Sequence, residues 1–311
     1  MLSIRASICI FAVKKLFNIN PTRGDQAERM GKFATKDRFK APRGYSRTKV
    51  VLDNNVPIEI VDPIENKNNN LIFVIHGGGY IVGMSDIYRN LAKRYSKAGR
   101  GARVAFLDYR LSPEYKYPCA LEDALAGWDW VLRQGYNPKD VTVIGDSAGG
   151  NLTLALMLKL REMKKDLPGA MVLMSPWTDM TASGDSYIKN FKDDALFGGK
   201  QEVTLEMKEE LINSSIYSFI GDADRKDPLI SPALASFEGF PRSMVLVGSH
   251  EILMDDSLTI VKKMKEAGID VELLVGEGMF HIWPLFCRLF PEGEKAMKAI
   301  CEYIYKSYES R

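Results

Sequence analysis

The sequence predicts an α/β fold in which a mostly parallel sheet is covered by helices on both faces. From residue 71 onwards, short and continuous apolar segments alternate with longer segments of helical periodicity. This alternation is typical of buried parallel strands joined by helices. The chain has 311 residues and 46% hydrophobic residues, which suits one large domain with an insertion.

The expected elements follow in order along the chain. Thr48–Leu52 and Val56–Val61 are rich in β-branched residues, and the turn Asp53-Asn54-Asn55 joins them into an opening hairpin. Later strands are short apolar runs, and the helices between them carry apolar residues at helical spacing. The expected strands are Leu71–Ile75, Arg103–Tyr109, Val141–Gly145, Met171–Met174, Met244–Val247 and Val271–Val275, and the expected helices are Ile87–Lys97, Ala120–Leu132, Ala148–Met163, Asp256–Glu266 and Glu294–Tyr305.

One polar stretch, residues 180–226, interrupts the alternation and contains only the helix-like segment Leu205–Tyr217. An insertion that follows a strand lies above the carboxyl edge of the sheet, where such folds bind ligands. We therefore expect residues 1–47 and 180–226 to form a helical cap. Residues 48–179 and 227–311 then form the catalytic core.

The N-terminal segment contains apolar residues at helical spacing, with Ile4, Ile8, Phe11 and Lys15 on one stripe of an amphipathic helix. Its apolar run is too short for a secretory signal, and no small-residue cleavage site follows it. No later stretch approaches the roughly 20 apolar residues that span a bilayer. We expect a cytoplasmic protein without stable membrane insertion, and weak membrane association through the first helix is the alternative.

Charge and cysteine content exclude several classes of protein. The formal net charge is +2, from 42 basic and 40 acidic residues, and neither sign forms a long block. This balance argues against a nucleic-acid partner and favours a small, mostly uncharged substrate. The irregular spacing of the cysteines predicts free thiols and no zinc site; they are Cys9, Cys119, Cys287 and Cys301.

The segment Gly145-Asp146-Ser147-Ala148-Gly149 matches the motif G-x-S-x-G between an expected strand and an expected helix. In this context the glycines allow a tight turn that exposes the serine hydroxyl at the start of the helix. The alternative is a glycine-rich turn with a helix-capping serine. The motif predicts an α/β-hydrolase fold with Ser147 as nucleophile.

A second glycine-rich segment, His76-Gly77-Gly78-Gly79-Tyr80, follows the strand Leu71–Ile75. Acyl transfer requires backbone N–H groups directed at the oxyanion, and glycines allow the close approach of the backbone. An N–H group from this segment and that of Ala148 are the expected donors. We interpret His76 as a residue that organises the loop.

The general base in this fold comes after the acid in the chain, and only His250 and His281 follow Ser147. His281 lies in the last strand-to-helix loop, at the same edge of the sheet as the other motifs, and is preferred over His250. Candidate acids in the preceding loop are Glu251, Asp255 and Asp256. Glu251 is nearest to the strand end, whereas the two aspartates suit the start of a helix.

These segments together resemble the bacterial hormone-sensitive-lipase family of carboxylesterases over roughly residues 48–311. The resemblance implies a triad of Ser147, Glu251 and His281, with Asp255 as a second carboxylate, and oxyanion N–H groups from Gly78, Gly79 and Ala148. Glu251 stands where aspartate is commoner in the family. The segments that carry the resemblance are His76-Gly77-Gly78-Gly79, Tyr109-Arg110-Leu111-Ser112-Pro113-Glu114, Gly145-Asp146-Ser147-Ala148-Gly149-Gly150 and Asp227-Pro228-Leu229-Ile230-Ser231-Pro232.

The expected function is hydrolysis of short- to medium-chain acyl esters through an acyl-enzyme on Ser147, without a metal or organic cofactor. A deacetylase of acetylated sugars or other metabolites is the main alternative, and an amidase or peptidase is a weaker one. A non-catalytic binder on the same fold is the alternative from another class, although the retained His281 argues against it. The resemblance also allows a homodimer, because family members often pair through the last strand or its helix.

Overall fold

The computed structural model of the chain describes residues 2–16, 37–65, 67–199 and 203–309. Its centre is an eight-stranded sheet with the strand order β1-β2-β4-β3-β5-β6-β7-β8. The predicted α/β fold with a mostly parallel sheet is confirmed. The strands are β1 (Tyr45–Val51), β2 (Pro57–Pro63), β3 (Leu71–Ile75), β4 (Arg103–Leu107), β5 (Val141–Asp146), β6 (Ala170–Met174), β7 (Arg242–Gly248) and β8 (Val271–Gly276).

The sheet begins with the predicted hairpin, in which β1 and β2 pair antiparallel, and Asn55 adopts a φ of 64° in the turn. β2 also pairs antiparallel with β4, and all later pairs are parallel. β3 lies between β4 and β5, so the next two strands along the chain are placed on opposite sides of β3. The loops after β3 and β5 therefore meet at the switch point, where such sheets bind ligands.

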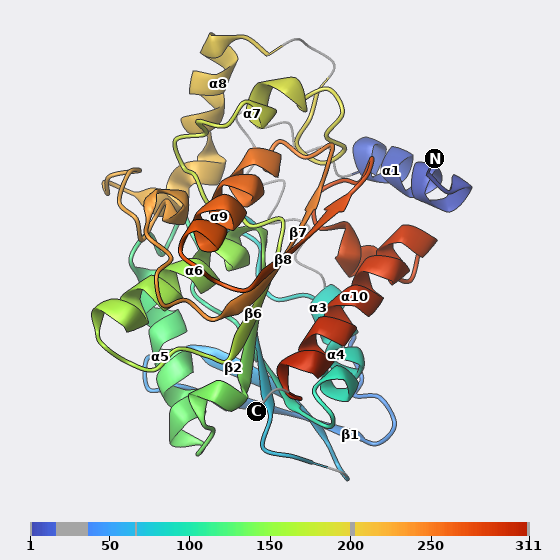
Figure 1. The fold of residues 1–311 in the computed structure, drawn as a ribbon, viewed down its shortest axis with the longest axis vertical. Coiled ribbons are helices and arrows are strands. Elements are labelled where there is room, and N and C mark those ends of the chain that lie inside the picture. Colours follow the sequence, from blue (N-terminus) through green and yellow to red (C-terminus); the bar gives the residue numbers. More distant parts are fainter. Residues whose placement is uncertain (1, 17–36, 66, 200–202, 310–311) are drawn as a thin grey trace.

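Helices cover both faces of the sheet (Figure 1). One core layer contains apolar residues of α5, α6 and α9, and the other contains those of α4, α10 and α1. The helices are α1 (Ile4–Leu16), α3 (Asp86–Arg89), α4 (Ala92–Ala98), α5 (Cys119–Arg133), α6 (Ser147–Glu162), α7 (Ser186–Lys189), α8 (Leu205–Ile212), α9 (Met254–Glu266) and α10 (Pro291–Ser307), with 3₁₀ turns η1 (Pro138–Asp140), η2 (Ser215–Ile220), η3 (Pro232–Leu234) and η4 (Trp283–Phe286).

Two predicted helices are interrupted in the structure. The segment predicted as one helix over Ile87–Lys97 forms α3 and α4, joined by a tight turn in which Leu91 N–H donates to the Tyr88 carbonyl at 2.9 Å. The segment Leu205–Tyr217 forms α8 and then η2, because the short polar residues around Ser214 favour a turn, and Ser214 itself is extended.

The segment 180–226 contains α7, α8 and η2, and Figure 1 shows α7, α8 and α1 at the same end of the molecule. The strand β1 begins at Tyr45, so the sheet includes the last residues of the segment 1–47 that the sequence assigns to the cap. Residues 17–36 of that segment lie outside the described residues. All four cysteines are free.

The helix α1 forms over the predicted segment, but the apolar stripe from which the helix is predicted faces solvent. Ile4, Ile8 and Phe11 are exposed, whereas Ala6 and Val13 on the opposite side are buried. In the part of the chain that the structure describes, no helix combines the length and the apolar character needed to cross a bilayer.

Candidate active site

The turn from β5 into α6 holds Ser147 at the start of the helix with a φ of 51°. Close packing requires the two flanking glycines. A Cβ atom on Gly145 would lie 2.4 Å from the Gly149 carbonyl oxygen, and one on Gly149 would lie 2.1 Å from the Ile75 carbonyl oxygen. The strained serine conformation is thus fixed by its neighbours, as expected of a nucleophile turn.

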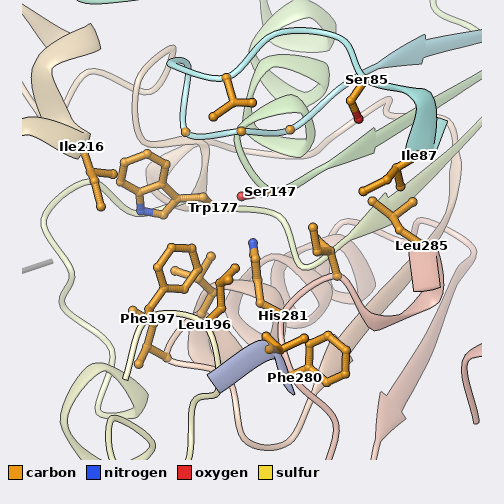
Figure 2. A pocket seen from close by; sticks show the side chains of 18 of the residues that line it. Ser85, Ile87, Ser147, Trp177, Leu196, Phe197, Ile216, Phe280, His281 and Leu285 are labelled. Carbon is orange, nitrogen blue, oxygen red and sulfur yellow. The ribbon is translucent and has the colours of Figure 1, made fainter. Parts of the chain in front are cut away.

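His281 and Glu251 form a buried hydrogen-bonded pair, with 2.8 Å between Nδ1 of the imidazole and Oε2 of the carboxylate. His281 follows β8, and Glu251 follows β7. Nε2 of His281 has no hydrogen-bond partner among the residues that the structure describes. Figure 2 shows this side of the ring directed towards the Ser147 hydroxyl across the cavity.

The other candidate residues have different surroundings. The Asp255 carboxylate accepts a hydrogen bond from Ser186 N–H at 2.8 Å, and that of Asp256 accepts one from Thr178 N–H at 2.6 Å. Both aspartates thus bind backbone N–H groups of the segment that follows β6. The backbone N–H of His250 donates to the Met279 carbonyl. Of these candidates, the structure brings Glu251 and His281 together.

Ser175 is a site residue that the sequence reasoning missed. Its hydroxyl donates to Oε1 of Glu251 at 2.7 Å and accepts from Ile282 N–H at 3.1 Å. The Gly248 N–H also donates to Oε1 of Glu251. Ser175 is fully buried just after β6 and has a φ of 46°, so the acid and the residue after His281 share one fixed hydroxyl.

The glycine loop after β3 lines the same cavity as Ser147. Gly78 and Gly79 have φ values of 115° and 62°, and a Cβ on Gly78 would lie 2.5 Å from the Val82 carbonyl oxygen. Within the described part of the chain, no backbone acceptor binds the N–H group of either glycine. Ala148 lies in the first turn of α6, where N–H groups have no intrahelical partner.

Gly77, in contrast, uses its N–H group to join the two loops. It donates to the Tyr88 hydroxyl and to Oδ1 of Asp146, both at 3.0 Å, and the Tyr88 hydroxyl donates to Oδ2 of Asp146. Burial raises the pKa of Asp146 to about 7, while these hydrogen bonds act in the opposite direction. Asp146 therefore connects the nucleophile turn to the glycine loop, a role that the motif alone did not reveal.

His76 is a structural residue of this loop, as the sequence interpretation expected. Its ring is fully buried and stacks on Tyr109 with 4.3 Å between the ring centroids. The Tyr109 hydroxyl donates to the His76 carbonyl at 2.8 Å. Burial lowers the pKa of His76, which favours the neutral ring.

The neighbouring residue of Tyr109, Arg110, forms an ion pair with the buried carboxylate of Asp123 at 2.7 Å.

The cavity has a volume of about 310 Å³ and a mostly apolar wall. Figure 2 shows Ser147 and His281 between two groups of apolar side chains, with Trp177, Ile216 and Phe197 on one side and Ile87 and Leu285 on the other. Its walls come from the core, the segment 180–226 and α1; they include Val13, Gly78, Gly79, Val82, Ser85, Tyr187, Leu196, Leu211, Tyr217, Ile252, Phe280, Ile282 and Phe286.

The site thus combines a strained serine, a histidine held by a carboxylate, and N–H groups that have no acceptor among the described residues, all around one apolar cavity. Across the described ranges, no group of three or more His, Cys, Asp or Glu side chains has the arrangement of a metal site. With the nucleophile turn after β5 and the histidine after the last strand, this is the arrangement of an α/β hydrolase.

Comparison with known proteins agrees with this assignment. The family profile described as alpha/beta hydrolase fold matches residues 72–285, and the chain belongs to this family. An esterase of Acinetobacter venetianus is 34% identical over 234 residues, which are 75% of this chain and 74% of the relative. An acetyl-hydrolase of Streptomyces hygroscopicus is 32% identical over 249 residues, which are 80% and 79% of the two chains.

The fold is also similar to the crystal structure of an esterase from the bacterial hormone-sensitive lipase family. The TM-score is 0.82 at 30% identity, and the match covers 99% of both chains. The resemblance seen in the sequence is therefore confirmed, and the chain is a carboxylic ester hydrolase.

Proposed function

We propose that this hydrolase is a serine carboxylesterase for short- to medium-chain acyl esters, with Ser147, His281 and Glu251 as its triad. The observation that carries the proposal is the 2.8 Å hydrogen bond between His281 and Glu251. It leaves Nε2 of His281 unpartnered among the described residues, on the side of the ring that faces Ser147 (Figure 2). A base held in this tautomer is suited to accept a serine proton.

Acylation begins when Ser147 Oγ attacks the ester carbonyl carbon and its proton moves to Nε2 of His281. The N–H groups of Gly78, Gly79 and Ala148 stabilise the resulting oxyanion. Each such donor typically lowers the barrier by about 2.7–4 kcal/mol. The intermediate then collapses, the bond to the alcohol oxygen breaks, and the alcohol leaves with the proton from His281.

Deacylation repeats these steps with water as the nucleophile. His281 takes a proton from water, the hydroxide attacks the acyl-enzyme carbonyl, and the proton returns to Ser147 Oγ as the acid departs. Glu251 keeps the proton of the neutral ring on Nδ1 and stabilises the imidazolium in both halves of the reaction.

The cavity supports the substrate range. Its volume of about 310 Å³ lies at the lower end of small-molecule sites, which span about 300–1,000 Å³. The apolar walls on both sides of Ser147 suit an acyl chain and a small alcohol group better than a sugar with many hydroxyl groups. We therefore rank simple acyl esters above acetylated sugars.

Deacetylation of a metabolite remains the second candidate, because one relative is named an acetyl-hydrolase. Hydrolysis rates across p-nitrophenyl esters of increasing acyl length, measured beside an acetylated xylose series, separate the two. The proposal expects the highest kcat/KM on a short or medium acyl ester. A preference for the acetylated sugars would replace it with the deacetylase.

Ser147→Ala tests the nucleophile. We expect the loss of at least about 10³-fold in kcat on p-nitrophenyl butyrate, because the nucleophile has no substitute. A fluorophosphonate probe should label the wild-type chain on Ser147 and leave the variant unlabelled. Retained hydrolysis in the variant contradicts the triad, and an unreactive wild-type chain favours a non-catalytic binder.

The expected partner is a small-molecule ester alone, without nucleic acid. The homodimer and the cytoplasmic location expected from the sequence stay predictions. β8 is an edge strand of the sheet and is partly exposed, which supports pairing of two copies along this strand. The mass of the protein in solution tests the homodimer.

A further inference from the structure

The first helix, α1, carries apolar residues on two opposite sides. At 3.6 residues per turn, Ala6, Cys9 and Val13 form one stripe, and Ile4, Ile8 and Phe11 form the other. The first stripe is buried. The second, which we call the outer face, is exposed, with 80%, 63% and 68% of the three side chains accessible. Packing within a single chain does not explain why the outer face is apolar.

The helix is fixed to the rest of the protein at both ends. Ser3 donates from its hydroxyl to the carboxylate of Glu292, in the first turn of α10, at 2.8 Å. Lys14 donates from its amine to the Lys192 carbonyl at 2.7 Å, in the segment 180–226. The helix and its outer face are thus in place before any partner binds, which removes the ordering cost of a flexible anchor.

The charged side chains of α1 itself have one sign, and the one acid described as bound near it, Glu292, accepts hydrogen bonds from Ser3 at the end of the helix. Arg5, Lys14 and Lys15 are basic, and α1 contains no acidic residue. Arg5 and Lys15 are exposed beside the apolar stripe. A short helix with apolar side chains outwards and basic side chains beside them is typical of a helix that lies in the surface of an anionic membrane.

A second copy of the chain fits this face less well. A twofold interface pairs each surface with itself. Pairing two outer faces would bring Arg5 and Lys15 of both copies together, and the helix offers no acid to compensate them. An anionic lipid surface complements the same charges and can bury Ile4, Ile8 and Phe11 at once.

We propose that α1 docks the protein onto anionic lipid bilayers through Ile4, Ile8 and Phe11, with Arg5 and Lys15 at the headgroups. Val13, on the inner side of the same helix, lines the catalytic cavity. The docked helix therefore lies between the lipid surface and the site, so apolar esters that partition into the membrane are concentrated next to the cavity. The binding step does not depend on the proposed chemistry.

Co-sedimentation with vesicles tests the proposal. The full chain should bind vesicles of phosphatidylcholine with phosphatidylglycerol more tightly than vesicles of phosphatidylcholine alone, and added salt should weaken the difference. In the double variant Ile8→Asn, Phe11→Asn the partition coefficient should fall by roughly tenfold or more. In Arg5→Gln, Lys15→Gln the preference for phosphatidylglycerol should disappear.

A matched control replaces two exposed apolar residues elsewhere. Met163 and Leu234 are 45% and 47% accessible. Their double Asn variant should bind vesicles like the wild-type chain. All variants should hydrolyse a dilute soluble p-nitrophenyl ester at the wild-type rate, because none of these residues lines the cavity. This activity also shows that each variant is folded.

Three results would overturn the proposal. In the first, the wild-type chain does not bind anionic vesicles. In the second, the Ile8→Asn, Phe11→Asn variant binds them as well as the wild type does. In the third, the wild-type chain is a dimer that the same substitutions convert to a monomer. The last result would assign the outer face to a second copy of the chain. A failure of ester hydrolysis alone leaves the lipid binding measurable and concerns only the proposed function.

Discussion

Ser175 donates a hydrogen bond from its hydroxyl to Oε1 of Glu251 at 2.7 Å. The same hydroxyl accepts from the N–H of Ile282 at 3.1 Å. One buried atom therefore fixes both the carboxylate and the backbone next to His281. Since a misplaced carboxylate cannot hold the imidazole in its working orientation, Ser175 is expected to act as a positioning residue.

Ser175→Ala should lower kcat by roughly 10- to 100-fold, because a hydrogen bond to a charged group contributes about 1.5–3 kcal/mol and each 1.4 kcal/mol is about tenfold in rate. KM should change little, since Ser175 does not line the cavity. Because loss of this donor changes both the position and the charge distribution of the carboxylate beside the imidazole, the kcat/KM profile should shift along the pH axis.

Ser243→Ala is the matched control for this variant. Ser243 is also fully buried, and its hydroxyl donates to the Pro241 carbonyl at 2.8 Å, away from the site. It should lose stability without a change in the pH profile. An unmoved profile in Ser175→Ala would reduce Ser175 to a purely structural residue.

Substitutions of the two candidate acids, Glu251 and Asp255, should have different effects on kcat. Glu251→Gln should lower kcat by about 10³–10⁴-fold, because an amide favours the wrong imidazole tautomer. Asp255→Asn should keep kcat within about twofold and lose roughly 1 kcal/mol of stability, because Asp255 holds the Ser186 N–H rather than the ring. Steady-state kinetics and urea unfolding on both variants decide the question. A large loss of kcat in Asp255→Asn alone would exchange the two roles.

The buried carboxyl of Asp256 should make stability depend on pH. Burial raises its pKa to about 8, whereas an unfolded aspartate titrates near about 3.9. Between these values the folded chain binds more protons than the unfolded chain, so the free energy of unfolding falls as pH rises from about 4 towards 8. Asp146, with a pKa of about 7, acts in the same direction.

Urea unfolding at several pH values checks this dependence. Asp256→Asn carries no proton to lose, so its free energy of unfolding should depend less on pH than that of the wild-type chain. Equal slopes in the wild type and Asp256→Asn would show that Asp256 is ionised throughout.

Local sequence patterns were sufficient to predict the strands of the sheet. The strands β3 to β7 are short, largely apolar runs with both faces buried, so their composition marks them, whereas the edge strand β8 is partly exposed. The turn around Ser147 was also readable, because the close approach of Gly149 to Ile75 excludes any side chain and leaves a motif in the sequence.

Contacts between distant residues left no such mark. Ser175 and Glu251 are 76 positions apart, and Asp146 and Gly77 are 69 apart, so neither hydrogen bond has a local signature. In α1 the helical spacing was clear, but apolar residues recur on both sides of the helix. Only the packing against α10 shows that Ile4, Ile8 and Phe11 are on the exposed side.

Asp146 couples two parts of the site that the chain encodes far apart. Its carboxylate is shared between the Gly77 N–H and the Tyr88 hydroxyl, and its backbone continues directly into Ser147. The glycine loop and the serine turn are therefore joined directly by one buried side chain. Separation of Gly78 and Gly79 from Ser147 would first require rupture of the hydrogen bonds of this shared carboxylate.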